Sequence, residues 1–337
     1  MKLLFSLALL VLTSYAVNCS KISVEIAPDP AIKYANSITL EELKENLYEF
    51  ASDAYEGRNT GELGQKKAAA FLKNQYKNSG VATPIGNDDY FQEIPASFLP
   101  AGIKDSENVV AFVAGTTFPE EIIVISAHYD HIGTENGEIY NGADDDASGT
   151  VAILEIAEAF QLAANDGKGP KRSLLFLNVT AEEKGLFGSK WYVENPLFPI
   201  ENHVANLNID MVGRVDDAHK NKPNFIYLIG ADKLSSELHE VSEEANKKFV
   251  NLDLDYTFND ENDPNRFYYR SDHYNFAKNN VPIIFYFNGT HEDYHQIGDT
   301  PDKIEYDLLE NRSRLIFYTA WELANREERI KVDKTSK

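Results

Sequence analysis

Short runs of apolar residues alternate along this chain with longer segments in which apolar residues recur at helical spacing. The apolar runs predict strands at residues 122–125, 174–179, 205–209, 225–229 and 283–287. The helical spacing predicts helices at residues 64–79, 147–164, 186–193, 234–249 and 306–324. An earlier helix is expected after Thr39, because Thr39 and Glu42 form a capping-box pattern. Buried strands that alternate with helices are typical of an α/β three-layer sandwich, in which a mostly parallel central sheet carries helices on both faces.

Residues 1–19 have the pattern of an export signal. Met1 and Lys2 precede an apolar stretch at residues 3–13 that is too short for a stable membrane span. The only cysteine, Cys19, follows this stretch in a way that resembles the lipidated cysteine of bacterial lipoprotein signals. The alternative is ordinary cleavage near Ala16, which would leave Cys19 as a free thiol. In both cases we expect export, to the periplasm, the outer envelope or the extracellular space.

The rest of the chain divides into a short arm and one domain. Residues 20–38 contain Pro28 and Pro30 and little periodicity, which predicts a linker or an extended arm. Residues 39–330 are expected to form a single domain with a sizeable core, because 43% of the 337 residues are hydrophobic. A single cysteine cannot form an internal disulfide, so the core must supply the stability.

The charge of the chain argues against several kinds of partner. The formal net charge is −22, whereas nucleic acids and anionic membranes are bound by clustered Lys and Arg. Any membrane contact is therefore expected to run through a lipid on Cys19. The acidic loop at residues 259–265 lacks the carboxylate spacing of an EF-hand, so we interpret it as a solvated loop. No pattern in the sequence indicates an oligomeric state.

Residues that can bind metal follow several predicted strands or precede the long helix at 147–164. They are His128, Asp130, Asp144, Asp145, Asp146, Glu182, Glu183, Asp210 and His295. In open α/β sheets ligands bind at the carboxyl ends of the strands, so we expect these side chains to meet at one edge. Each motif alone is weak, because Asp-rich helix starts and Glu-Glu pairs commonly have structural roles. Imidazoles gathered with several mutually repelling carboxylates are better explained by bound zinc.

The same residues, in this order, resemble the motifs of the M28 zinc peptidases, a family that includes bacterial leucyl aminopeptidases. The matching residues are Tyr55 to Gly61, His128-x-Asp130, Gly142 to Gly149, Glu182-Glu183-x-Gly185-Leu186-x-Gly188-Ser189, Asp210-Met211 and His295. The resemblance covers roughly residues 40–325 and implies an α/β sandwich of the zinc-dependent exopeptidase type. Many relatives carry a protease-associated domain before the first metal motif, and residues 90–121 are too few to hold it here.

The resemblance implies a site for two Zn²⁺ ions. His128 and Asp210 would bind one zinc, Glu183 and His295 would bind the other, and Asp145 would bridge them. A bridging carboxylate suits two ions about 3.5–4 Å apart, the spacing found in two-metal hydrolases such as aminopeptidases. The aspartates on either side of Asp145 are alternatives for the bridge, and otherwise cap the helix that follows.

Three further residues take roles by the same resemblance. Glu182 would be the general base, which takes a proton from the attacking water and passes it to the leaving amine. Asp130 would orient His128. Tyr268 would donate a hydrogen bond to the oxyanion, with the adjacent Tyr269 as an alternative that would otherwise pack. Other histidines near the motifs exceed the ligand number and are expected to have hydrogen-bonding or surface roles: His131, His273 and His291.

These features predict a metallo-exopeptidase that acts on a peptide or protein substrate, and an aminopeptidase in particular. A glutaminyl cyclase on the same fold is one alternative, but in that subfamily an insertion separates the Glu-Glu pair from the Gly-Ser that follows closely here. A carboxypeptidase or dipeptidase of the same family is another alternative, because loops build the specificity pockets. An inactive binding protein is disfavoured, since Glu182 and every implied ligand are present.

Overall fold

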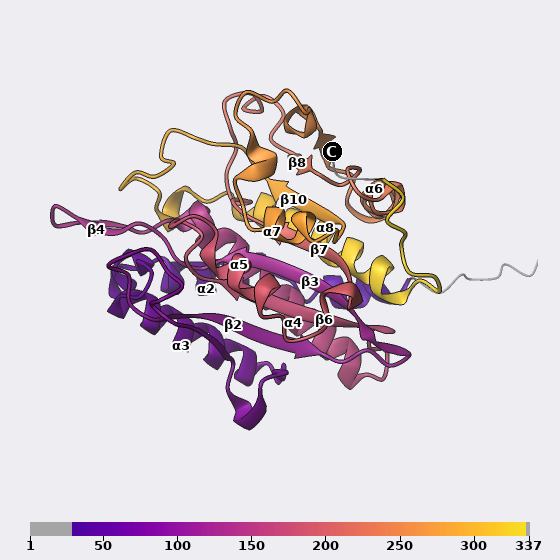
Figure 1. The fold of residues 1–337 in the computed structure, drawn as a ribbon. Helices are drawn as coiled ribbons and strands as arrows, with labels where there is room; N and C mark the ends of the chain where they lie inside the picture. The colour runs from indigo at the N-terminus through magenta and orange to yellow at the C-terminus, as the bar shows by residue number, and fades with distance from the viewer. Residues whose placement is uncertain (1–28, 335–337) are drawn as a thin grey trace, which may run out of the picture.

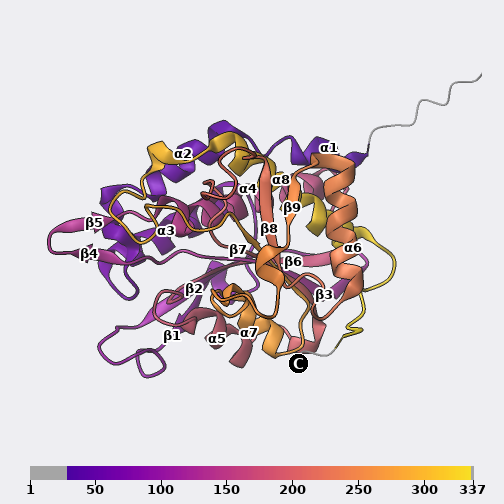
Figure 2. The ribbon, with the colours of Figure 1, turned by 90° about the horizontal axis from the view of Figure 1, so that it is seen from above.

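The computed structural model describes residues 29–334, and in it a central eight-stranded sheet lies between two layers of helices (Figure 1, Figure 2). The order of strands across the sheet is β1-β2-β6-β3-β7-β10-β8-β9. Their bounds are β1 Phe91–Ile94, β2 Ser106–Val113, β3 Phe118–His128, β6 Arg172–Val179, β7 His203–Ile209, β8 Phe225–Ile229, β9 Asp253–Asp255 and β10 Ile283–Phe287. The central strands β6, β3, β7 and β10 are parallel, whereas β1, β2 and β8 run antiparallel to their inner neighbours. The predicted α/β fold is confirmed, with the parallel strands in the middle of a mixed sheet.

Helices cover both faces of this sheet. They are α1 Pro30–Ala35, α2 Leu40–Phe50, α3 Leu63–Asn78, α4 Gly149–Asn165, α5 Phe187–Glu194, α6 Ser236–Ala245, α7 His273–Lys278 and α8 Tyr306–Asn325. Helices α4 and α8 pack on one face with α1, α2, α3 and α6 around them, while α5 and α7 pack together on the other face (Figure 2). The segment Ala143–Asn165 is long and apolar enough to cross a membrane, but 78% of its most apolar window is buried inside the protein. Its composition therefore fits the central helix of the core.

The predicted strands and helices are all present, with some ends shifted. Thr39 caps α2 as expected, since its Oγ1 accepts a hydrogen bond from the backbone N–H of Glu42 at 3.3 Å. Helix α6 begins later than predicted because Ser235 caps it, with Oγ accepting from the N–H of Leu238 at 3.2 Å. The strands β1, β2 and β9 and the helix α7 were not predicted. Strand β2 was missed because it begins with polar residues that the structure buries, among them Asn108.

The prediction of a linker at residues 20–38 is wrong for the part that the structure describes. Asp29 accepts a hydrogen bond from the N–H of Ala31 at 3.0 Å, and Pro30 occupies the first turn of α1, where its missing N–H is not needed. Tyr34 is 4% exposed and stacks on Trp321 of α8, with ring centroids 5.6 Å apart. Pro30 therefore begins a packed helix. The predicted leader and Cys19 lie outside the described residues.

Arg58 joins the segments that lead to the candidate site. Its side chain is fully buried and donates hydrogen bonds only to backbone carbonyls: Tyr129 O at 2.9 Å, Phe50 O at 3.3 Å, Asn141 O at 2.7 Å and Gly142 O at 2.9 Å. Burial lowers the pKa of Arg58 to about 10, so the guanidinium is still charged near neutral pH. It ties the end of β3 to the return strand of the β4–β5 hairpin (Gly133–Glu135 and Glu138–Tyr140), which projects from the body (Figure 1).

Arg58→Met is expected to lower the free energy of unfolding by about 3–5 kcal/mol, because several buried carbonyls lose their donors at once. Urea unfolding followed by circular dichroism measures this change. The matched control is Lys67→Met in the same region, which breaks an exposed ion pair with Glu56 (2.6 Å) and should cost less than about 1 kcal/mol. Equal losses in the two variants would contradict the role of Arg58.

Glu155 of α4 predicts a pH dependence of stability. Its side chain is 4% exposed, and burial, with the nearby charges of Glu42 and Glu158, raises its pKa to about 8. The unfolded chain loses this proton near pH 4.5, whereas the folded chain holds it to about pH 8. The free energy of unfolding therefore falls as the pH rises through that window. Glu155→Gln should therefore gain stability relative to wild type at pH 8 but not at pH 4, as measured by urea unfolding. Glu41→Gln, which changes an exposed glutamate, should show no such difference.

Candidate metal centre

The parallel strands bring the predicted ligands to one edge of the sheet. His128 is the last residue of β3, and Asp210 directly follows β7. Glu182 and Glu183 come just after β6, and His295 lies in the loop after β10. Because these strands run parallel and side by side, their carboxyl ends deliver all these side chains to the same place.

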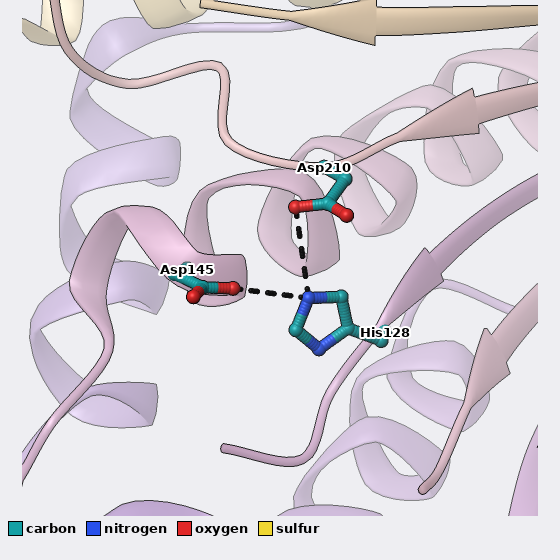
Figure 3. A group of neighbouring side chains, drawn as sticks. All are labelled: His128, Asp145 and Asp210. Atoms are coloured by element: carbon teal, nitrogen blue, oxygen red, sulfur yellow. Dashed lines mark ion pairs between the residues drawn. The ribbon is translucent and has the colours of Figure 1, made fainter. Parts of the chain in front are cut away.

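One group of candidate metal-ligand atoms, called donors from here on, lies around the Nε2 atom of His128 (Figure 3). This nitrogen lies 3.1 Å from Asp145 Oδ1 and 3.6 Å from Asp210 Oδ1. The three side chains converge from β3, from the turn before α4 and from the end of β7. They are 1%, 3% and 8% exposed, so their charges are largely removed from water.

A second group of donors surrounds the other oxygen of Asp145. His295 Nε2 lies 3.0 Å from Asp145 Oδ2 and 3.5 Å from Glu183 Oε2. His131 joins this group, since its Nδ1 is 2.8 Å from Glu183 Oε1 and 3.9 Å from Asp145 Oδ2. The two oxygens of one carboxylate thus face two separate sets of donors, and all five predicted ligands are brought together.

The three consecutive aspartates have different surroundings. Asp144 and Asp146 accept hydrogen bonds from neighbouring segments, and their donors are Gly213 N at 2.7 Å, Asn288 Nδ2 at 3.0 Å, Gly149 N at 2.9 Å and Met211 N at 3.0 Å. Asp299 supports the same turn by accepting from the N–H of Asp144 (3.0 Å) and of Asp145 (3.1 Å). Of the three, Asp145 is the one whose carboxylate lies between the imidazoles.

Asp130 acts differently from the sequence expectation. The nearest hydrogen-bond partner of His128 Nδ1 is the backbone carbonyl of Asp130 at 3.1 Å. The carboxylate oxygen Oδ1 of Asp130 is 3.8 Å from the same nitrogen. That carboxylate instead accepts from Thr60 Oγ1 at 2.7 Å and from the N–H of Glu182 at 3.1 Å. The residue therefore orients His128 through its backbone and fixes the chain at Glu182 through its side chain.

The prediction for Tyr268 is wrong in this structure. Its ring lies over Gly230 and near Lys233 Nζ (5.1 Å), in a groove separate from the metal donors. The tyrosine that lines the cavity with the donors is Tyr294, which stacks on His295 with ring centroids 3.9 Å apart. The resemblance of residues 267–273 to the family pattern favoured Tyr268, whereas the signal for Tyr294 was that it directly precedes His295 in the sequence.

His131 belongs to the second donor group, although the sequence analysis did not predict it as a ligand. It is fully buried, and within the described residues neither ring nitrogen has a hydrogen-bond partner of good geometry. Its position three residues after His128, in the same strand-end loop, was the available signal. The other two histidines form hydrogen bonds as expected: His273 Nε2 lies 2.8 Å from Tyr268 O, and His291 Nε2 lies 3.1 Å from Asp144 Oδ2.

The electrostatics of the donors fit bound zinc. Burial by itself raises the pKa of Asp145, but hydrogen bonds from His128 and His295 hold it well below its usual range. For His128, burial lowers the pKa and the charges of Glu182 and Asp210 more than offset this. The buried Glu183 Oε1 lacks a hydrogen-bond donor among the described residues. Imidazole nitrogens and carboxylate oxygens are the ligands of hydrolytic zinc, and a cation would relieve the repulsion among the carboxylates.

The sequence profile of peptidase family M28 matches residues 108–320, which are more than half of the chain. The fold and the donor set define a protein of the zinc-peptidase class, and this chain belongs to peptidase family M28. A probable zinc metalloprotease of Leptosphaeria maculans is 30% identical over 148 residues, which are 43% of this chain and 33% of that protein. Carboxypeptidase Q of Mus musculus is 31% identical over 137 residues, or 41% and 26%. The chain thus matches a third or less of the length of these curated relatives.

Solved structures share the fold over most of the chain. LapB from Legionella pneumophila has a TM-score of 0.69 at 23% identity, over 88% of this chain and 75% of that one. An aminopeptidase from Aneurinibacillus sp. strain AM-1 has a TM-score of 0.65 at 16% identity, over 90% and 98%. A glutaminyl cyclase from an Acidobacteriales bacterium has a TM-score of 0.65 at 17% identity, over 86% and 96%. The fold alone therefore does not distinguish a peptidase from a cyclase.

Removal of metal should destabilise the protein. We expect a chelator to lower the unfolding temperature of the zinc-loaded wild type by about 5 °C or more, because an ion that binds only the folded state stabilises it. In Asp145→Asn this shift should fall to less than half, since both donor groups lose the same carboxylate. Differential scanning fluorimetry with and without EDTA measures both shifts. Asp217→Asn, at an exposed position, should keep the full shift, and a full shift in Asp145→Asn would refute the shared carboxylate.

Proposed function

We propose that this protein is a zinc exopeptidase with a two-metal centre, and that it acts as an aminopeptidase on peptide or protein substrates. The observation that carries this proposal is the position of Asp145, whose two oxygens face separate groups of donors 3.1 Å and 3.0 Å away. His128 and Asp210 would hold one ion, and Glu183 and His295 the other. Zinc bound there would lower the pKa of water and polarise the scissile carbonyl.

Glu182 is the proposed proton carrier. It lines the cavity together with His128, Asp145 and Asp210, and its N–H donates to Asp130 Oδ1 at 3.1 Å, which fixes its backbone. Burial, together with the charges of Asp210 and Glu183, raises the pKa of Glu182 well above its usual range, against the opposing charge of His128. A carboxylate with a raised pKa accepts a proton from water more readily and can return it to the leaving amine.

The shape of the cavity supports attack on a terminal residue. Its volume is about 30 Å³, so the cavity accepts a small group rather than a long stretch of peptide. Four apolar side chains line it: Met211, Phe267, Phe285 and Phe287. We therefore propose a terminal residue with an apolar side chain. A free amine there would be attracted by the carboxylate of Glu182, which lies outside the proposed ligand set, and this supports an enzyme that acts at an amino terminus.

A carboxypeptidase or dipeptidase is the second candidate. It is favoured by Arg270, a guanidinium that lines the same cavity and would attract a substrate carboxylate. Carboxypeptidase Q among the relatives is in keeping with this candidate, although only 26% of its length is matched.

Glu182→Gln is expected to lower kcat by about 10²–10⁴-fold, because the amide cannot accept the proton. Bound zinc should stay unchanged, as measured by elemental analysis, since Glu182 is outside the proposed ligand set. The assay compares leucyl peptides that have free or acetylated N-termini, with and without chelator. The matched control is Glu201→Gln, which changes an exposed glutamate after helix α5 and should keep wild-type activity.

Each other outcome points to a different enzyme. Cleavage of acetylated peptides would indicate a carboxypeptidase or endopeptidase. Cyclisation of N-terminal glutamine without hydrolysis would indicate a glutaminyl cyclase. Full activity in Glu182→Gln would rule out the proposed base.

A further inference from the structure

Among the described residues, Arg270 is the only lysine or arginine that lines the metal-centre cavity. It shares this lining with Glu182, Asp210 and His295, and its own side chain is exposed. It directly follows the short helical turn Phe267–Tyr269, which crosses the apolar cluster beside β10. A fixed positive charge at the mouth of an acidic cavity is suited to hold an anion next to the reacting atoms.

Two aromatic side chains fix the direction of this guanidinium. Its carbon lies 4.8 Å from the ring centroid of Phe267, within the range of a cation–π contact. Its Nη2 lies 3.4 Å from the hydroxyl of Tyr294, the tyrosine that stacks on His295. The guanidinium is therefore held on the His295 side of the cavity.

Most of the donor capacity of Arg270 is left for a ligand. Within residues 29–334 it forms no ion pair, whereas Arg214 pairs with Asp293 at 3.2 Å. The buried arginines of the chain donate to backbone carbonyls or carboxylates: Arg58, Arg172, Arg214 and Arg312. Arg266 and Arg329 likewise form no ion pair among the described residues, but neither of them lines this cavity. The geometry leaves the planar fork of Arg270 available to a carboxylate that arrives with the substrate.

We propose that Arg270 is a specificity-determining residue that binds a substrate carboxylate on the leaving side of the scissile bond. This inference rests on the proposed peptidase function. A free N-terminal amine is repelled by the guanidinium and drawn to the acidic donors, so the two ends of a short substrate are oriented in opposite directions. Two extended residues span about 7 Å, so the terminal carboxylate of a dipeptide lies within reach of the same cavity. An acidic side chain on the second residue of a longer peptide offers the same chemistry.

The test compares substrates that differ only in this carboxylate. Leu-Gly and its C-terminal amide test the terminal carboxylate, and Leu-Asp-Gly-amide and Leu-Asn-Gly-amide test the side chain. For the zinc-loaded wild type we expect kcat/KM to be at least tenfold higher for the acid of one pair, through a lower KM. In Arg270→Gln that ratio should approach one, and Arg270→Lys should recover part of it. A purely structural role would change both members of a pair equally.

The matched control is Arg266→Gln. Arg266 belongs to the same loop and lies over the ring of Tyr269 (4.9 Å), but it lines the separate groove that contains Lys233. This variant should keep the wild-type ratio. Zinc content and unfolding temperature, measured for each variant, verify that the fold and the metal centre are intact.

The outcomes separate the role of Arg270 from the proposed peptidase function. Wild-type ratios near one for both pairs, or a ratio that survives in Arg270→Gln, would overturn the role of Arg270 while leaving the peptidase function in place. Failure of the zinc-loaded wild type to cleave any of the four peptides would overturn the proposed function, and this inference with it. A ratio confined to one pair identifies the source of the carboxylate.

Discussion

The structure depends on how it holds mutually repelling carboxylates in a buried position at one edge of the sheet. Asp145, Glu183 and Asp210 meet there, and burial makes their repulsion stronger than it would be in water. The imidazoles of His128 and His295 lie between them at 3.0–3.6 Å. Such an arrangement is stable only with compensating positive charge, which is why a cation fits the site better than a neutral hydrogen-bond network does.

The segments around this centre are joined to one another by hydrogen bonds of their own. Asp144, Asp146 and Asp299 accept backbone and side-chain hydrogen bonds that join the turn before α4 to the loops after β7 and β10. Arg58 and Arg312 stabilise the same connecting segments by donating hydrogen bonds to their backbone carbonyls. The loops are therefore fixed without using the atoms of Asp145 that face the donors. Rigid support of this kind lets a metal centre keep its geometry.

Much of the fold and of the donor set was predictable from the sequence, and the reasons are local. Strands β8 and β10 match their predicted ranges because both are buried apolar runs. The ligands follow parallel strands, so their order in the chain determines their place in space. Strand β2 and helix α1 were not predictable in this way, since the burial of Asn108 and the packing of Tyr34 on Trp321 depend on tertiary contacts. The same holds for Tyr294, whose position depends on the stacking of its loop against His295.

The metal ligands and the rest of the cavity lining thus differ in what fixes their positions. His128 and Asp210 come from the ends of parallel strands, where hydrogen bonding across the sheet fixes the backbone, and Asp145 comes from the turn before α4. Part of the remaining cavity lining instead comes from two loops, with Phe267 and Arg270 in one and Thr290 and Tyr294 in the other. Their relative positions depend on aromatic contacts between those loops, such as the 4.8 Å approach of Phe267 to Phe287. A change in the loop of Phe267 and Arg270 can therefore alter which end of a peptide the proposed site holds while the metal ligands stay in place, whereas the loop of Tyr294 also carries the proposed ligand His295.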